Sequence, residues 1–198
     1  MRGVPDGWEV VEPPRFRQSG GSFDHYRRWL GGELTRRQER VALAGHSMGG
    51  ALALLAAVDE PALVERLILV SPAGLPLTKP LPASAFTFVG QLLRGSYPPG
   101  AVCRMAVNTF SAPRAALALA RTVHDLDLTP ELARLRERGV PVTVIGCPGD
   151  GLVTRAHCRR LAGLAGAKYR EVDAPNGHIW PVTQPERLRR ELAVHPSG

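Results

Sequence analysis

The chain has 198 residues, of which 44% are hydrophobic and 22% charged, and it carries a formal net charge of +7. These proportions are typical of one globular domain with a buried core and exclude a wholly disordered chain. The longest unbroken apolar run, 51–58, is too short to cross a bilayer, and residues 1–10 lack the apolar segment of a secretory signal peptide. We therefore expect no membrane span.

The positive charge does not by itself indicate a nucleic-acid-binding protein. Among the 25 basic residues, only Lys79 and Lys168 are lysines, and the arginines are spread along the whole chain with no block longer than two. Aromatic residues make up 6%, which is too few for a platform that stacks bases. We expect no nucleic-acid partner.

The three cysteines, Cys103, Cys147 and Cys158, are odd in number and have no C-x-x-C spacing. Neither a disulfide framework nor a structural zinc site is indicated, and Cys147, which follows an apolar run, is predicted to be a buried free thiol. No His, Asp, Glu or Cys cluster has metal-ligand spacing. We expect a reduced, cytoplasmic protein without a cofactor.

Short apolar runs bounded by glycine, proline or charge predict strands that are buried on both faces. Four runs have this pattern clearly, and a fifth run near the N-terminus has it weakly. The clear runs are 40–45, 67–71, 141–146 and 169–173, and the weak one is 8–12.

Helical patterns separate the predicted strands. Ser22 or Asp24 can cap the first helix, and Pro185 begins the last one, at a position where proline is favourable. Alternating strands and helices predict an α/β fold with a mostly parallel sheet. The predicted helices are 24–34, 48–58, 156–164 and 185–192.

One long segment, 74–128, interrupts this alternation. It has proline-rich loops, then short helical patterns over 101–123, and no strand signal. We interpret it as a helical cap inserted into the fold; a plain pair of packing helices is the alternative. The predicted domain organisation is therefore a first core part, 1–73, the cap, 74–128, and a second core part, 129–198.

The motif with the clearest chemistry is G-x-S-x-G at 45–49, between a predicted strand and an Ala/Leu-rich helix. A serine on such a tight turn needs small residues two positions away on each side, which Gly45 and Gly49 provide. The turn exposes the Ser47 hydroxyl above the sheet. It also leaves the Met48 N–H at a helix N-terminus, where it can stabilise an oxyanion.

Two other glycine-rich turns are poorer matches. A dinucleotide-binding turn would need glycine where Ser47 stands and an acidic residue after the next strand, 67–71. A phosphate-binding P-loop would need a lysine after the glycines, and none is present. A glycine turn without chemistry is the remaining alternative.

The run A-G-H-S-M-G-G, with its strand and helix, resembles the nucleophile turn of the α/β-hydrolase superfamily, and the likeness extends over about 8–192. In that family the order is serine, acid, histidine. C-P-G-D-G-L-V after 141–146 resembles the family's acid turn, and N-G-H after 169–173 resembles its base turn. The resemblance implies a triad of Ser47, Asp150 and His178; Asp173 is an alternative acid.

Other candidate residues receive structural interpretations. His46, beside the serine, is expected to pack or to form a hydrogen bond next to the turn. Asp125 and Asp127 are expected to cap or flank a helix. The remaining histidines are expected to be solvated or structural: His25, His124, His157 and His195.

The resemblance is incomplete at the front of the chain. The family has an H-G turn that supplies a second oxyanion N–H, on a strand between those matched by 8–12 and 40–45, and this sequence has no such turn. We expect the first strands of the fold to be missing, so that the flanking strands either pair directly or the chain begins downstream of the true start. Loss of one oxyanion donor costs about a hundred- to a thousandfold in rate, which predicts a poor catalyst.

The resulting prediction is a serine hydrolase that cleaves an ester or related acyl bond of a small molecule. A thioesterase, peptidase, C–C hydrolase or acyltransferase of the same fold is an alternative, as is a catalytically silent protein that serves as a binding module. The oligomeric state is not predicted.

Overall fold

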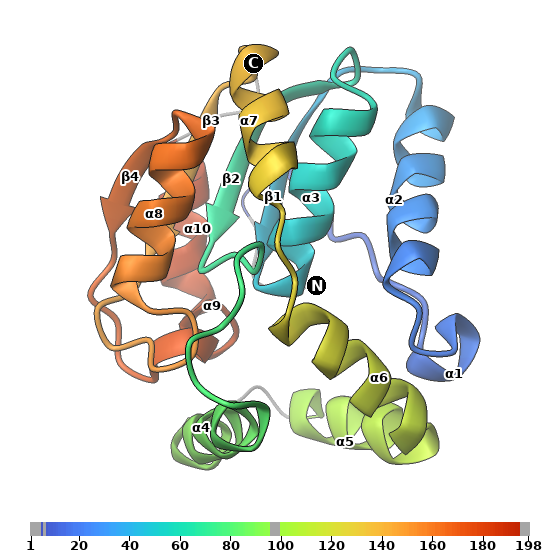
Figure 1. Ribbon diagram of the computed structural model, residues 1–198, viewed down its shortest axis with the longest axis vertical. Helices are drawn as coiled ribbons and strands as arrows, with labels where there is room; N and C mark the ends of the chain where they lie inside the picture. The colour runs from blue at the N-terminus through green and yellow to red at the C-terminus, as the bar shows by residue number, and fades with distance from the viewer. Residues whose placement is uncertain (1–4, 6, 96–99, 195–198) are drawn as a thin grey trace.

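The computed structural model describes residue 5, residues 7–95 and residues 100–194, and its centre is a parallel sheet (Figure 1). Four strands lie side by side in chain order. They confirm the four clear strand predictions, with shifted ends. The strands are β1 (Val41–His46), β2 (Val64–Val70), β3 (Val142–Gly146) and β4 (Lys168–Glu171).

Apolar side chains on both faces of the sheet explain why these segments form inner strands. Leu67 and Leu69 of β2 belong to one core cluster, whereas Ile68 and Val70 belong to a second cluster on the opposite face. Because alternate residues of a strand point to opposite faces, an unbroken apolar run supplies both clusters.

Helices cover both faces of the sheet unequally. On one face, α3 packs on β1 and β2, α8 packs on β3, and α2 and α7 lie outside them; α9 and α10 cover the other face, where Trp180 is fully buried (Figure 1). The helices are α2 (Phe23–Arg37), α3 (Met48–Asp59), α7 (Thr129–Glu137), α8 (Arg155–Ala165), α9 (Trp180–Thr183) and α10 (Pro185–Ala193).

The predicted strand 8–12 is wrong. Among the described residues β1 has only β2 as a sheet neighbour, so 8–12 and β1 do not pair directly. A groove of about 420 Å³ separates them, lined also by Leu34 and Glu33 of α2. The segment 8–12 is tied to α2 instead: the guanidinium of Arg37, the last residue of α2, is 2.8 Å from the Glu9 carboxylate. Without an adjacent strand to pair with, an extended segment has no ladder of backbone hydrogen bonds and is not a strand.

Between β2 and β3 the described residues form helices and no strand. Three of these helices lie at the end of the molecule where the strands have their carboxyl ends (Figure 1). The division into a core and a cap at 74–128 stays a prediction. The three are α4 (Leu81–Arg94), α5 (Ala101–Ser111) and α6 (Pro113–His124), and the short α1 (Phe16–Ser19) contacts α5 and α6.

Helix α7 was not predicted, although its signals are present in the sequence. Pro130 stands in its first turn, Leu132 and Leu135 are buried one turn apart, and the Asp127 carboxylate accepts a hydrogen bond from the Thr129 N–H at 3.0 Å. Asp127 therefore flanks the start of the helix, as one of the two expectations had it, while Leu128 is the N-cap residue.

Two further observations bear on the predicted class of protein. Within the described ranges, no helix is both long and apolar enough to cross a bilayer, and no three His, Cys, Asp or Glu side chains are grouped as metal ligands. Cys147 is a buried free thiol, as predicted.

Candidate active site

Ser47 lies on a strained turn between β1 and α3. Its φ of 54° and ψ of −122° are unusual for a residue with a side chain. The turn is fixed from the neighbouring strand: the Ser47 N–H donates to the Val70 carbonyl at 3.1 Å, and the Ala73 N–H donates to the Ser47 carbonyl at 3.0 Å. These bonds hold the strained conformation above the sheet.

The glycines around Ser47 have different roles. A Cβ on Gly45 would lie 2.3 Å from the Gly49 carbonyl oxygen, so this position requires glycine. A Cβ on Gly49 would meet nothing within 4 Å, which contradicts the sequence argument that this position must be small. The crowded position on that side is Gly50, whose Cβ would lie 2.8 Å from the Pro72 side chain. The close neighbour is the loop after β2, which is distant in sequence.

The three residues of the predicted triad lie in contact. His178 Nε2 is 2.9 Å from Ser47 Oγ, and His178 Nδ1 is 2.8 Å from Asp150 Oδ2. The side chains come from the turns that follow β1, β3 and β4, because parallel strands bring their carboxyl ends to one edge of the sheet. Asp150 and His178 are 4% and 1% exposed. The geometry is that of a nucleophile, a base and an orienting acid.

Asp150 is held in its charged form despite its burial. Burial alone would raise its pKa, but the hydrogen bond and the charge interaction with His178 lower it, as do the N–H groups of Leu152 and Val153, and the net shift is downward. Those two N–H groups donate to Asp150 Oδ1 at 2.9 and 2.8 Å. An ionised Asp150 can orient the His178 ring and stabilise its protonated form.

The alternative acid, Asp173, is not part of this arrangement. Asp173 is exposed, and the hydrogen bonds of the His178 ring are made with Asp150 and Ser47. Asp173 stands five residues before His178 in the sequence, but it is exposed to solvent. Of the two candidates, only Asp150 lies against the base.

The base turn is pressed against the acid turn through a glycine. Gly177 has a φ of 55°, and a Cβ there would lie 2.5 Å from the Gly149 carbonyl oxygen. His178 then sits in a short 3₁₀ helix, η1 (Gly177–Ile179), directly before α9. Without a side chain at Gly177, the two turns can approach closely enough for the His178–Asp150 hydrogen bond.

His46 supports the base from the strand side, as expected. Its Nε2 is 2.8 Å from the His178 carbonyl oxygen, and the centroids of the two imidazole rings are 4.7 Å apart. Burial, with a further contribution from the charge of His178, lowers the pKa of His46 to about 3. A neutral His46 donates its Nε2–H to that carbonyl and positions the backbone of His178.

Two contacts from the segment between β2 and β3 were not predicted. The His178 N–H donates to Gln91 Oε1 of α4 at 3.0 Å, and the Lys79 ammonium donates to the Gly151 carbonyl at 2.9 Å. Gln91 and Lys79 are far from both turns in sequence, and a single glutamine in a helix carries no pattern that could have revealed the contact. They join this segment to the base and acid turns.

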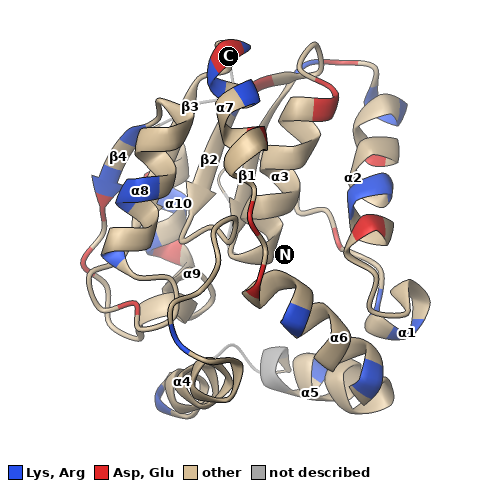
Figure 2. Ribbon diagram, in the orientation of Figure 1, with Lys and Arg blue, Asp and Glu red and all other residues tan. Residues whose placement is uncertain are grey.

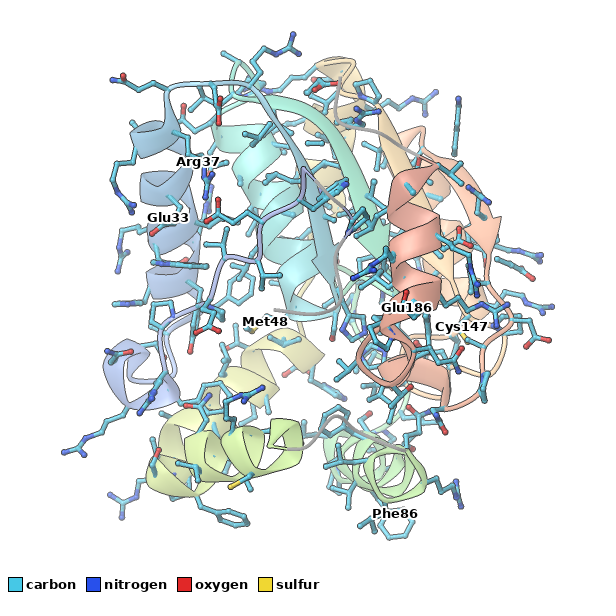
Figure 3. All side chains as sticks on the ribbon, turned by 180° about the vertical axis from the view of Figure 1, so that it is seen from behind. Glu33, Arg37, Met48, Phe86, Cys147 and Glu186 are labelled. Carbon is cyan, nitrogen blue, oxygen red and sulfur yellow. The ribbon has the colours of Figure 1, made fainter. Side chains whose placement is uncertain are left out.

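Met48 is the first residue of α3, at the end of the helix that faces α4–α6 (Figure 3). A first-turn N–H has no acceptor within its own helix and is free to bind an anion. Of the other histidines, His124 contacts Asp125 and the Lys79 carbonyl. His195 lies outside the described residues.

The sequence matches the model of a known family over residues 3–191, and the description of that family is "Alpha/beta hydrolase family". The chain belongs to the α/β hydrolase family. A search of curated proteins finds no matching sequence.

Solved structures of α/β hydrolases have the same fold. One is an enol-lactonase from Burkholderia xenovorans LB400, with 21% identity, 94% of this chain and 75% of that chain covered, and a TM-score of 0.63. Another is a lipase-esterase related protein from Clostridium acetobutylicum ATCC 824, with 14% identity, 95% and 79% covered, and a TM-score of 0.64. A third, an N-acyl homoserine lactone degrading enzyme, has 17% identity, 88% and 75% covered, and a TM-score of 0.62. At these identities the likeness concerns the fold, and the chain spans about three quarters of their length.

Proposed function

We propose that this α/β hydrolase is a serine hydrolase that cleaves an ester or a related acyl bond of a small molecule. The observation that carries the proposal is the unbroken chain of contacts from Ser47 Oγ through the His178 ring to Asp150. A serine hydroxyl is a weak nucleophile until a base removes its proton, and the base acts best when a carboxylate orients it.

In the proposed reaction, Ser47 Oγ attacks the substrate carbonyl carbon while His178 Nε2 takes the hydroxyl proton. The resulting oxyanion accepts a hydrogen bond from the Met48 N–H. The intermediate collapses to an acyl-enzyme, and His178 gives its proton to the departing alcohol. Water, deprotonated by His178, then attacks the acyl-enzyme and releases the acid and free Ser47. Asp150 keeps the imidazole in the required tautomer throughout.

We expect slow turnover. Met48 is the one oxyanion donor for which the described residues supply an argument, and a second donor contributes about a hundred- to a thousandfold in rate. Formation of the covalent intermediate requires a nucleophile and a base, and the contact between Ser47 Oγ and His178 Nε2 supports these roles. Labelling of Ser47 is therefore a more sensitive test than turnover.

Related structures support an acyl bond as the target. The enol-lactonase and the N-acyl homoserine lactone degrading enzyme are named for lactones, which are cyclic esters, and a third structure is named for lipases and esterases. Serine attack on a carbonyl is chemistry that an ester or lactone substrate requires.

The decisive experiment is labelling with a fluorophosphonate probe, followed by hydrolysis of short p-nitrophenyl esters. We expect the wild-type protein to be labelled and Ser47→Ala to be unlabelled. Ser71→Ala is the matched control, because Ser71 also follows a strand with a positive φ of 39° but does not contact His178. Absence of labelling in folded wild-type protein would overturn the proposal and favour a catalytically silent binding module.

A further inference from the structure

Helices α4, α5 and α6 lie at one end of the molecule and carry positive but no negative side chains; the exposed Asp125 directly follows α6. Figure 2 shows blue segments and no red ones on their ribbons. In the sequence, no Asp or Glu lies between Glu65 and Asp125. None of the ion pairs found among the described residues includes an arginine of these helices. The four arginines, all exposed, are Arg94, Arg104, Arg114 and Arg121.

Large apolar side chains are exposed on the same three helices. Phe86 and Leu93 of α4 are 81% and 82% exposed, and Phe110 of α5 is 80% exposed. Phe86, Val89 and Leu93 follow one another at three and four residues, so they form a stripe along one side of α4. Phe86 points away from the sheet (Figure 3). These side chains are exposed, so packing in the core of this chain does not explain why they are apolar.

Helix α6 combines both properties on one side. Arg114, Leu117 and Arg121 are exposed and stand at three and four residues from one another. Exposed apolar side chains with arginines beside them are characteristic of helices that lie in a membrane interface, where the apolar groups enter the acyl region and the cations meet lipid phosphates. We call the exposed side chains of α4, α5 and α6 the α4–α6 face.

We propose that the α4–α6 face docks onto the surface of an anionic lipid bilayer. The positive charge of this face distinguishes between its possible binding partners. In a symmetric pair of copies this face would meet itself, which would place arginines against arginines with no carboxylate on these helices to compensate. A neutral surface would leave the arginines without counter-charges. An anionic bilayer supplies an apolar layer and phosphates together.

The proposal concerns binding and does not depend on the proposed hydrolysis. It does determine an orientation, because α4–α6 and the turns that carry Ser47 and His178 lie at the same end of the molecule (Figure 1). Docking through this face would direct the carboxyl ends of the strands toward the bilayer.

The test is co-sedimentation of Ser47→Ala protein with vesicles, since this variant cannot consume lipid. We expect it to bind vesicles of phosphatidylcholine mixed with phosphatidylglycerol and not vesicles of phosphatidylcholine alone, and we expect added salt to weaken the binding. Arg114→Gln and Arg121→Gln should each weaken binding about fivefold. Phe86→Ser and Leu93→Ser should each weaken it about tenfold.

Matched controls come from elsewhere on the chain. Arg134→Gln and Arg138→Gln remove exposed arginines near the end of α7, and Val182→Ser removes an exposed apolar side chain of α9. None of these should change vesicle binding. Melting temperatures should be the same for all variants, because every substituted side chain is exposed.

Four outcomes would overturn the proposal: no binding to anionic vesicles, equal binding to neutral vesicles, equal weakening by the controls, or a dimer in sedimentation that Phe86→Ser dissociates. Labelling of wild-type Ser47 together with a failure to bind vesicles would reject the docking surface and leave the proposed hydrolysis intact.

Discussion

The proposed triad and the α4–α6 face lie at the same end of the molecule, but they differ in burial and in the pairing of their polar groups. Asp150 and His178 are buried, and each polar atom of the Ser47–His178–Asp150 chain has a hydrogen-bond partner. On the α4–α6 face the arginines form no ion pair among the described residues, and large apolar side chains face solvent. The proposed hydrolysis requires hydrogen bonds that hold its groups in place, whereas the exposed groups of the α4–α6 face suit the proposed docking.

Two hydrogen bonds connect these regions. Lys79 reaches the acid turn at Gly151, and Gln91 of α4 reaches the backbone of His178. The buried region therefore depends in part on the segment that carries the exposed face. Substitutions in each region, measured by hydrolysis rate and by stability, test whether the buried site functions independently of the segment that carries the exposed face.

The largest loss of rate should follow Asp150→Asn. It removes the charge that stabilises protonated His178, so we expect ester hydrolysis to fall by about 10⁴-fold. The measurement is kcat at a pH near neutrality. Asp173→Asn, which changes the exposed alternative acid, is the control and should leave kcat unchanged. A large loss with the control instead would show that Asp173 is the acid.

The second effect is a loss of stability when the turn around Ser47 is crowded by a side chain. Gly45→Ala places a Cβ 2.3 Å from the Gly49 carbonyl oxygen, and we expect it to destabilise the protein by about 3 kcal/mol, the upper end of the usual cost of overpacking. Gly49→Ala is the matched control: it meets no atom and lies in a helix, where alanine is favoured over glycine by up to about 1 kcal/mol. Denaturant unfolding measures both. Equal stability of the two variants would contradict the described packing of the turn.

The smallest effect should come from the connection between the regions. Gln91→Ala leaves the His178 N–H without its side-chain acceptor, and a loss of one hydrogen bond should lower kcat about two- to tenfold. Gln91→Glu keeps an acceptor and should restore most of the rate. Leu93→Ser, two residues away on α4 and exposed, should leave kcat unchanged. A comparable loss with Leu93→Ser would mean that α4 as a whole, rather than the Gln91 contact, positions the base.

Local patterns in the sequence were sufficient for much of the fold. The four inner strands are apolar runs, which need both faces of a sheet covered, and the strand–serine–helix turn was predicted from Gly45 and Gly49 around Ser47, of which Gly45 is crowded in the structure. The prediction of a strand at 8–12 was wrong because a strand needs a neighbour to pair with, and the only described neighbour of β1 is β2. Helix α7 was missed although its first-turn proline and the aspartate that flanks its start are both in the sequence.

The order of residues along the chain is enough to identify the reactive groups of this protein: a serine on a tight turn, a histidine and an acid late in the chain, and a segment without carboxylates. Which of these groups meet depends on how the chain folds. The fold places Asp150 rather than Asp173 on the base, makes Gly50 rather than Gly49 the crowded glycine, and brings Gln91 to the His178 backbone. These pairs join segments that are far apart in the sequence, and the distance between such segments depends on the packing of the whole domain, which no local pattern encodes.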